Sequence, residues 1–195
     1  SRGNLIIAGR TASDDYPVLQ TYGTPKGWDI VLTELNAGGT ALVGSIRIGG
    51  TGDDGINTGD SHSGGSRGLL NFYGDDARSE VILDNAGNVY LASCSQSIDF
   101  FTTPNAPFKT KSGGASDQDA VLIKTSPDLG ALLMSTYFGG SNLDAAYVLG
   151  VSPINGDIWI CGATESSDFP GNKSGTVGPA YSGGSTEGFV AVFSN

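Results

Sequence analysis

The chain has 195 residues, enough for one domain of ordinary size, and 31 of them are glycine. Its net charge of −10 argues against a nucleic-acid binder and against an electrostatic membrane anchor, because both need an excess of Lys and Arg. The glycines have no three-residue period, which excludes collagen, and 38% of the residues are hydrophobic, which excludes wholesale disorder. Short apolar runs between Gly-rich turns indicate an all-β protein.

The first predicted strand pattern lies near the N-terminus and recurs twice along the chain. Residues 3–17, 87–101 and 156–170 align without gaps over fifteen positions, and we call them motif C. Each copy begins with Gly-Asn or Gly-Asp, passes through a β-rich stretch and a Ser/Thr-rich turn, and reaches an aspartate that precedes an aromatic residue. These equivalent aspartates are Asp15, Asp99 and Asp168.

Three further motifs repeat in a fixed order after motif C. They are motif D at 28–35, 118–125 and 187–194, motif A at 41–50 and 132–140, and motif B at 78–87 and 147–156. The chain therefore follows the order C-D, A-B-C-D, A-B-C-D. Equivalent glycines lie 69 residues apart from 87 to 156 but 90 apart from 50 to 140, so the earlier full unit carries an insertion of 21 residues within 51–71.

Four strands in each repeated unit predict stacked four-stranded sheets, which are the blades of a β-propeller. A single sheet covers neither of its faces, whereas packing it between two copies buries both. The near-continuous apolar runs VYLA, AVLI, IWIC and FVAVF agree with burial on both faces. We expect about two and a half blades of a larger, partial propeller: a half blade at 1–39, a blade with the insertion at 40–130, and a blade at 131–195.

Several segments carry a resemblance to a known repeat. STYFGG at 135–140, GNVYL at 87–91, DFFTTP at 99–104 and DAVLIK at 119–124 resemble the SBBP-type β-propeller repeat, over almost the whole chain except the insertion. The resemblance implies a large secreted or cell-surface bacterial protein and, by association, cargo of the Bacteroidetes type IX secretion route. The chain departs from the repeat at Phe101, where the other copies have proline, and at Gly188, where an aspartate is expected and Glu187 stands beside it.

The repeated carboxylates are the first candidates for chemistry. Asp29 and Asp119 are equivalent, and so are Asp54 and Asp144. A catalytic pair of carboxyl groups needs unequal environments, so residues copied once in each unit favour a structural role as acceptors that fix a turn. A binding site that lines a central channel is the alternative.

The insertion is the second candidate. Its oxygen-bearing side chains could hold a hard cation such as Ca²⁺, although the bidentate glutamate of an EF-hand loop is missing. These residues are Asp53, Asp54, Asn57 and Asp60. A solvated or partner-contacting loop is the alternative, and His62 in the same loop could be a ligand or an acid–base group. We assign no catalytic, cofactor-binding or metal-binding residue on these patterns.

The cysteines and aromatic residues give weaker indications. We expect Cys94 and Cys161 to be free thiols rather than a disulfide. Trp159, within the IWIC run, is expected in the core, and Trp28, beside a loop, is the better candidate for an exposed sugar- or protein-binding surface. Other aromatic residues available for such a surface are Tyr22, Tyr73, Tyr137 and Tyr181.

The expected function is a non-enzymatic extracellular module, structural or adhesive. Its expected partners are other domains of the same larger chain and proteins or glycans at the cell surface, with no nucleic acid and no membrane insertion. The sequence begins without Met, and we expect it to be a piece of a longer protein. The alternative is a propeller-type glycosidase or lyase with carboxylates at the channel mouth. That enzyme would use the glutamates that are not repeated, Glu34, Glu80, Glu165 and Glu187.

Overall fold

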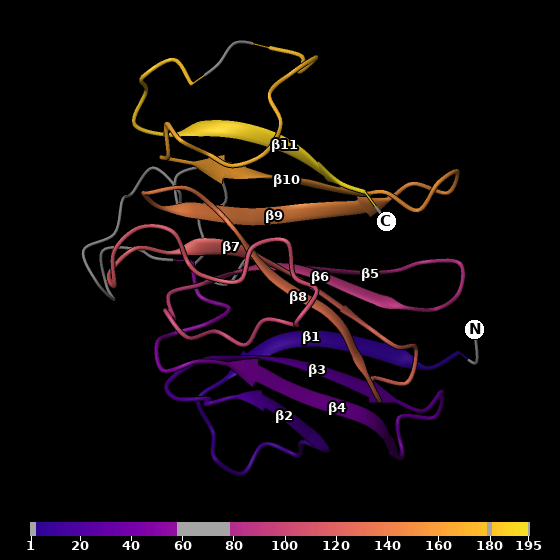
Figure 1. Ribbon diagram of the computed structural model, residues 1–195. Helices are drawn as coiled ribbons and strands as arrows, with labels where there is room; N and C mark the ends of the chain where they lie inside the picture. Colours follow the sequence, from indigo (N-terminus) through magenta and orange to yellow (C-terminus); the bar gives the residue numbers. More distant parts are fainter. Residues whose placement is uncertain (1–2, 58–78, 179–180, 195) are drawn as a thin grey trace.

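The computed structural model describes residues 3–57, 79–178 and 181–194, and within them the secondary structure consists of β-strands without helices (Figure 1). The strands are β1 (Leu5–Thr11), β2 (Gln20–Gly23), β3 (Asp29–Leu35), β4 (Leu42–Gly49), β5 (Glu80–Leu83), β6 (Val89–Ser95), β7 (Asp119–Thr125), β8 (Leu132–Phe138), β9 (Asp144–Val151), β10 (Ile158–Thr164) and β11 (Glu187–Phe193). The predicted all-β class is therefore confirmed.

These strands form three sheets that lie in successive layers (Figure 1). The first sheet has the order β1-β3-β4-β2, the second β5-β6-β7-β8, and the third β11-β10-β9. Neighbouring strands are antiparallel except for β2, which runs parallel to β4. The second sheet lies between the other two, so it is covered on both sides.

Each predicted motif contains a strand. Motif C gives β1, β6 and β10, motif D gives β3, β7 and β11, motif A gives β4 and β8, and motif B gives β5 and β9. The short strand β2 lies outside these motifs and was not expected. Its sequence QTYG is mostly polar and has no apolar run that would identify it.

The sheets group these strands differently from the predicted units 1–39, 40–130 and 131–195. The motif A strand β4 pairs with β3, with Leu32 opposite Ile46, and β8 pairs in the same way with β7. A short hairpin joins each D strand to the A strand after it, closed by hydrogen bonds from Asn36 N to Ala41 O and from Ser126 N to Ala131 O. The repeating sheet is thus B-C-D-A, and the chain crosses to the next sheet after motif A.

The second sheet has apolar residues buried on both faces. Val89, Leu91, Val121 and Ile123 pack against Ile30, Leu32, Ile46 and Ile48 of the first sheet. Tyr90, Ala92, Ala120 and Leu122 pack on the other face against Ala146, Leu149, Ile158 and Ile160 of the third sheet. Complete burial of one such aliphatic side chain stabilises the fold by about 1.5–3 kcal/mol, so these two interfaces hold the layers together.

The outer sheets show the alternation of a half-covered strand. Successive residues of β1 and β11 are exposed and partly buried in turn, whereas every residue of β6 is buried. The expected burial on both faces is therefore confirmed for the second sheet only. In the first and third sheets one face packs on the second sheet, and the opposite face carries exposed apolar side chains on the outer strands β1 and β11 and at Trp159 of β10, whereas β3 is buried along almost its whole length.

Candidate functional site

The most regular polar feature of the structure is a corner that occurs twice, at the end of β4 and at the end of β8. Corner 1 joins the first sheet to the second, and corner 2 joins the second sheet to the third. Corner 1 consists of Gly49, Gly50, Thr51, Asp54, Ser97 and Asp99, and corner 2 consists of Gly139, Gly140, Ser141, Asp144, Ser166 and Asp168.

A buried aspartate organises each corner. In corner 1, Asp54 Oδ2 accepts hydrogen bonds from Gly50 N and from Ser97 Oγ, both at 2.8 Å. In corner 2, Asp144 Oδ2 accepts from Gly140 N at 2.7 Å and from Ser166 Oγ at 2.8 Å. The carboxylate therefore fixes the Gly-Gly turn and ties it to a serine just after the motif C strand of the next sheet, which is the structural role that the repeat predicts.

A second aspartate joins the two sheets from outside. Asp99 Oδ1 accepts from Thr51 N at 2.8 Å and from Thr51 Oγ1 at 2.9 Å. Asp168 Oδ1 accepts from Ser141 N at 2.8 Å and from Ser141 Oγ at 3.0 Å. These hydrogen bonds stabilise the charged carboxylates, and they lower the pKa of both groups.

Close approach explains the paired glycines. A Cβ on Gly50 would lie 2.6 Å from Ser97 Cβ, and a Cβ on Gly140 would lie 2.5 Å from Ser166 Cβ. Neither distance is compatible with van der Waals contact. Glycine is therefore required because the backbone of one sheet touches the C strand of the next.

The remaining repeated carboxyl groups, Asp29 and Asp119, lie beside the first glycine of each pair, Gly49 and Gly139. Asp29 Oδ2 accepts from Arg47 Nη2 at 2.6 Å, and Asp119 Oδ2 accepts from Ser112 N at 2.9 Å. The Oδ1 atoms of both groups are buried and have no protein hydrogen-bond partner. Burying these carboxyl groups in their ionised form would cost free energy, because a charge without a partner loses its hydration.

Burial raises the pKa of all four inner carboxyl groups. The pKa of Asp54 and of Asp119 rises to about 7, and the pKa of Asp29 and of Asp144 rises to about 6. Desolvation is the largest cause in each case, and for Asp29 it outweighs the guanidinium of Arg47. Near neutral pH these four carboxyl groups are therefore partly protonated.

The first four residues of the range predicted for the insertion, 51–54, are part of the repeated structure. Residues 51–54 form corner 1, as 141–144 form corner 2. Asp53 Oδ1 accepts from Trp28 N at 3.1 Å, and Asn57 Oδ1 accepts from Gln118 Nε2 at 2.6 Å. Among the described residues, no three carboxylate, imidazole or thiol groups gather as a metal site. Asp60 and His62 lie outside the described residues.

The glutamates proposed for the enzyme alternative lie in different sheets. Glu34 is on β3, where its Oε1 accepts from Asn4 Nδ2 at 2.7 Å. Glu80 is on β5, where its Oε2 accepts from Leu149 N at 2.6 Å and so links the second sheet to the third. Glu187 begins β11 of the third sheet and pairs with Thr164, and Glu165 directly follows β10, where its Oε1 accepts from Thr186 Oγ1 at 3.3 Å. Glu34 and Glu80 are thus used in separate structural contacts.

Glu187, rather than Gly188, takes the strand position of the repeated aspartate. Ser95 pairs with Asp119 in the second sheet, and the equivalent Thr164 pairs with Glu187 in the third. The departure noted at Gly188 is therefore a shift of one residue. Glu187 is partly buried, and its Oε1 accepts from Ser182 N and Oγ, which lower its pKa.

Trp159 is more exposed than Trp28, which is the opposite of the predicted order. Trp159 was expected in the core, and this prediction was wrong: its side chain is exposed on the outer face of the third sheet. Trp28 is partly buried, and the guanidinium of Arg10 lies 5.2 Å from its ring centroid. The reason is that strands with nearly continuous apolar sequence are fully buried only where a sheet has neighbours on both sides.

The other aromatic and sulfur groups are mostly internal. Tyr137 is buried, accepts from Phe100 N at 2.8 Å and donates to Ser97 O at 2.6 Å. Tyr22 packs on Phe101 with ring centroids 5.5 Å apart. Tyr181 is partly buried, and Tyr73 lies outside the described residues. Cys94 and Cys161 are both free, as expected.

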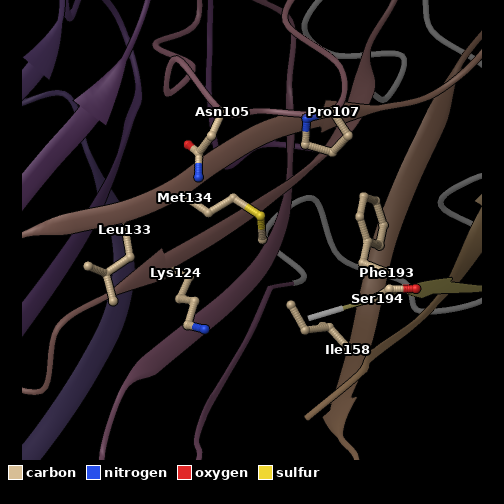
Figure 2. A pocket seen from close by; sticks show the side chains of 8 residues that line it. All are labelled: Asn105, Pro107, Lys124, Leu133, Met134, Ile158, Phe193 and Ser194. Atoms are coloured by element: carbon tan, nitrogen blue, oxygen red, sulfur yellow. The ribbon is translucent and has the colours of Figure 1, made fainter. Parts of the chain in front are cut away.

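A cavity of about 390 Å³ opens between the second and third sheets (Figure 2). Its lining comes from the loop at 105–107 and from β7, β8, β10 and β11, with Met134, Ile158 and Phe193 as the apolar walls. The ammonium of Lys124 lies 5.1 Å from the ring centroid of Tyr90. The cavity is of a size that suits a small ligand.

Sequence reasoning missed the serines of the two corners. Ser97 and Ser166 occupy the same position of motif C, two residues before the repeated aspartate, and the first copy has Ser13 there. The aligned motif contained this Ser-x-Asp signal.

Comparison of the chain with protein-family models and with curated protein sequences gives no match. Among the described residues there is no helix with the length and hydropathy that a membrane crossing needs.

Proposed function

We propose that this chain is part of a β-propeller built from SBBP-type repeats and that it serves as a non-enzymatic scaffold. The observation that carries the proposal is the repeated interface between sheets. Ile30 and Leu32 of the first sheet pack on the second sheet, and the equivalent Ala120 and Leu122 of the second pack on the third. A contact repeated in the same sense along the chain is the geometry from which radially arranged blades are built.

The proposed role is structural or adhesive, in a large secreted or cell-surface bacterial protein exported by the type IX route. The chain would present its loops on a rigid support to proteins or glycans, and it would contact other domains of the same larger chain. The two corners support this role because they fix the chain where it leaves β4 and β8. The net charge of −10 favours solubility.

The use of the repeated carboxyl groups supports a scaffold over an enzyme. The Oδ2 atoms of Asp54 and Asp144 have equivalent partners in both corners, a glycine backbone N–H and a serine hydroxyl. A glycosidase needs two carboxyl groups with different environments beside an open site. The glycosidase or lyase alternative has no comparable support among the described residues.

The first experiment measures the intact mass of the native protein and sequences peptides outward from both ends of this segment. A larger chain with additional copies of motifs A to D is expected, because closed propellers use about four to eight blades. A native mass near that of the 195 residues would contradict the propeller proposal.

The second experiment tests the scaffold role. The purified chain is screened against glycan arrays and extracellular proteins, and polysaccharide turnover is followed in parallel, for the chain and for a Glu34→Gln/Glu80→Gln/Glu165→Gln/Glu187→Gln variant. Saturable binding without turnover is expected. Turnover that disappears in the variant would support the enzyme instead.

A further inference from the structure

The outer edge of β11 is the first of two incomplete features of the third sheet. Within the described part of the chain, β11 pairs with β10 on one edge and with no strand on the other. The equivalent edges of β3 and β7 pair with β4 and β8, which are motif A strands that follow through short hairpins. The described third sheet therefore contains strands of motifs B, C and D and none of motif A.

The cavity between the second and third sheets is the second feature. Phe193, at the end of β11, faces Met134 of β8 across it (Figure 2). Met134 pairs with Lys124 on β7, and the equivalent pair in the first sheet is Gly44 with Glu34. The cavity therefore corresponds to the space beside Gly44 in the interface between the first and second sheets.

The hairpin between β7 and β8 fills that space in the first interface. A Cβ on Gly44 would lie 3.0 Å from Leu129 Cβ, so this hairpin touches β4. Leu129 is 1% exposed and belongs to the buried cluster between the first and second sheets. Gln20 Nε2 on β2 donates to Gly130 O at 2.8 Å and adds a polar contact to the same hairpin. A hairpin thus occupies in one interface the space that is open in the other.

The backbone of Leu129 indicates that its side chain is needed at this place. Its φ is 55°, the only positive value of a non-glycine residue in the described part of the chain. A branched side chain rarely adopts this conformation, which costs free energy. Gly39 stands at the equivalent position of the first hairpin, with a φ of 65°. Both hairpins therefore share the left-handed turn, and leucine occurs in the one that has a neighbouring sheet to pack against.

We propose that the outer edge of β11 and the cavity together bind one segment, a hairpin and a motif A strand that continue from β11 in the longer protein proposed above. The strand runs antiparallel to β11 in the register of β8 on β7, which places Val190 opposite the counterpart of Thr136. An apolar residue three positions after Ser194, the counterpart of Leu129, fills the cavity. The inference rests on the proposed function for the source of this segment, and on β11 and the cavity for its binding site.

Two features favour this occupant over a separate partner. The cavity opens beside the end of β11, where Phe193 and Ser194 line it and where a hairpin that follows β11 would begin. The hairpins after β3 and β7 are short, so a strand that follows β11 in the same way reaches its edge at high effective concentration. A separate partner would have to supply both an extended strand and an apolar turn residue at the same spacing.

The test adds a copy of residues 128–140 directly after Asn195, so that the new hairpin has the length of the one between β7 and β8. Leucine replaces the methionine of the copy, which leaves Met134 as the only methionine. The matched control has glycine in place of the copied counterpart of Leu129. Glycine adopts the left-handed turn, as Gly39 does, but has no side chain to fill the cavity. A Gly/Ser extension of equal length controls for the added chain.

Two rates are measured on each protein. Amide hydrogen exchange on β11 reports on the added strand, and oxidation of Met134 by hydrogen peroxide, followed by mass spectrometry, reports on the cavity. We expect the extension to slow both rates at least tenfold relative to the natural chain. The glycine control should slow exchange on β11 and leave the oxidation of Met134 close to its natural rate, and the Gly/Ser extension should change neither.

Exchange on β11 that is as fast in the extended chain as in the natural chain would overturn the proposal, and so would equal oxidation of Met134 in the extended chain and the glycine control. Protection that appears only as the concentration of the extended chain rises would assign the strand to a second copy and would also overturn it. These outcomes do not depend on the length of the native protein. A native mass near that of the 195 residues would instead refute the longer propeller, and with it the proposed source of the segment.

Discussion

Ser97 donates a hydrogen bond from its Oγ to Oδ2 of Asp54 over 2.8 Å, although 43 residues separate them along the chain. Ser166 and Asp144 repeat this hydrogen bond at the same distance in the next corner. Each bond joins the segment just after the motif C strand of one sheet to the chain that leaves the preceding sheet. The layers are therefore held together by a polar contact at the corner as well as by the apolar faces.

Ser97→Ala should destabilise the fold by about 1–3 kcal/mol, because it leaves the buried carboxyl group of Asp54 with one donor fewer. Ser166→Ala should do the same in corner 2. The matched control is Ser167→Ala, at an exposed position beside Ser166, which should stay within about 0.5 kcal/mol of the natural chain. Urea unfolding measures the differences, and equal effects of Ser166→Ala and Ser167→Ala would contradict the role of the serine.

Gly140→Ala should be severely destabilising, by about 1–3 kcal/mol or more, because the added methyl group would overlap Ser166. Gly150→Ala on β9 is the control, since a Cβ there meets no atom within 4 Å. It should be neutral or stabilising by up to about 1 kcal/mol. Thermal unfolding of the two variants checks the close approach at corner 2, and the account fails there if Gly140→Ala is as stable as Gly150→Ala.

The stability of the chain should fall as the pH rises from about 4 to about 7. Burial raises the pKa of Asp54 and of Asp119 in the folded state to about 7, while the unfolded groups titrate near 3.8. The folded state therefore binds more protons in this range, and its extra stability is present below pH 4 and lost as these groups ionise. The relevant measurement is the free energy of unfolding in urea at several pH values.

The control for the pH dependence is an Asp54→Asn/Asp119→Asn variant. Asparagine cannot ionise, so the slope of stability against pH should be smaller in the variant than in the natural chain. Repulsion within a chain of net charge −10 acts in the same direction, and the variant separates the two causes. An identical slope in both proteins would refute the assignment to these carboxyl groups.

Asp168→Ala should destabilise the contact between the second and third sheets by about 1 kcal/mol or less, because it removes two hydrogen bonds from Ser141 at an exposed position. Asp15→Ala is the matched control. Asp15 is the equivalent residue of the first copy, and its described hydrogen bond is a local one from Ser13. Hydrogen exchange of amides on β9 and β10 should increase only in Asp168→Ala, and an equal increase in both variants would speak against a role between sheets.

Leu122→Ala and Val190→Ala compare the same repeat position in a covered and an uncovered sheet. Leu122 pairs with Ala92, and the equivalent Val190 pairs with Cys161. Truncating the buried Leu122 should cost about 2–5 kcal/mol. Truncating the exposed Val190 should change the stability of the dilute chain by less than about 0.5 kcal/mol. Similar losses in both variants would mean that the outer face of the third sheet is covered.

The sequence predicted most of the strands because the repeat shows the same alternation of apolar runs and turns several times. It also predicted that the aspartates are structural, since copies such as Asp54 and Asp144 occupy equal positions. The grouping of strands was not predictable from order alone. In a repeat of four strands, the sequence order does not show at which strand one sheet ends and the next begins. The hairpin that joins β3 to β4 places β4 in the first sheet.

The exposure of Trp159 could not be derived for a related reason. An apolar strand such as β10 has the sequence of a strand that is covered on both faces, but its burial depends on whether a neighbouring sheet is present.

The sequence alignment of the two copies of motif B was off by one residue. Val81 pairs with Leu91 and the equivalent Leu149 with Ile160, because the turn from Ser152 to Asp157 is one residue longer than the turn from Asp84 to Asn88.

The central claim is that the outer face of the third sheet repeats a face that is buried in the second sheet. Trp159 reports on that face directly in a Trp28→Phe variant, which leaves it as the sole tryptophan. We measure its fluorescence emission and its quenching by acrylamide from nanomolar to millimolar protein concentration. The account predicts red-shifted emission that acrylamide quenches strongly, because the Trp159 side chain is exposed in this chain. Blue-shifted emission that acrylamide does not reach at the lowest concentration would contradict it.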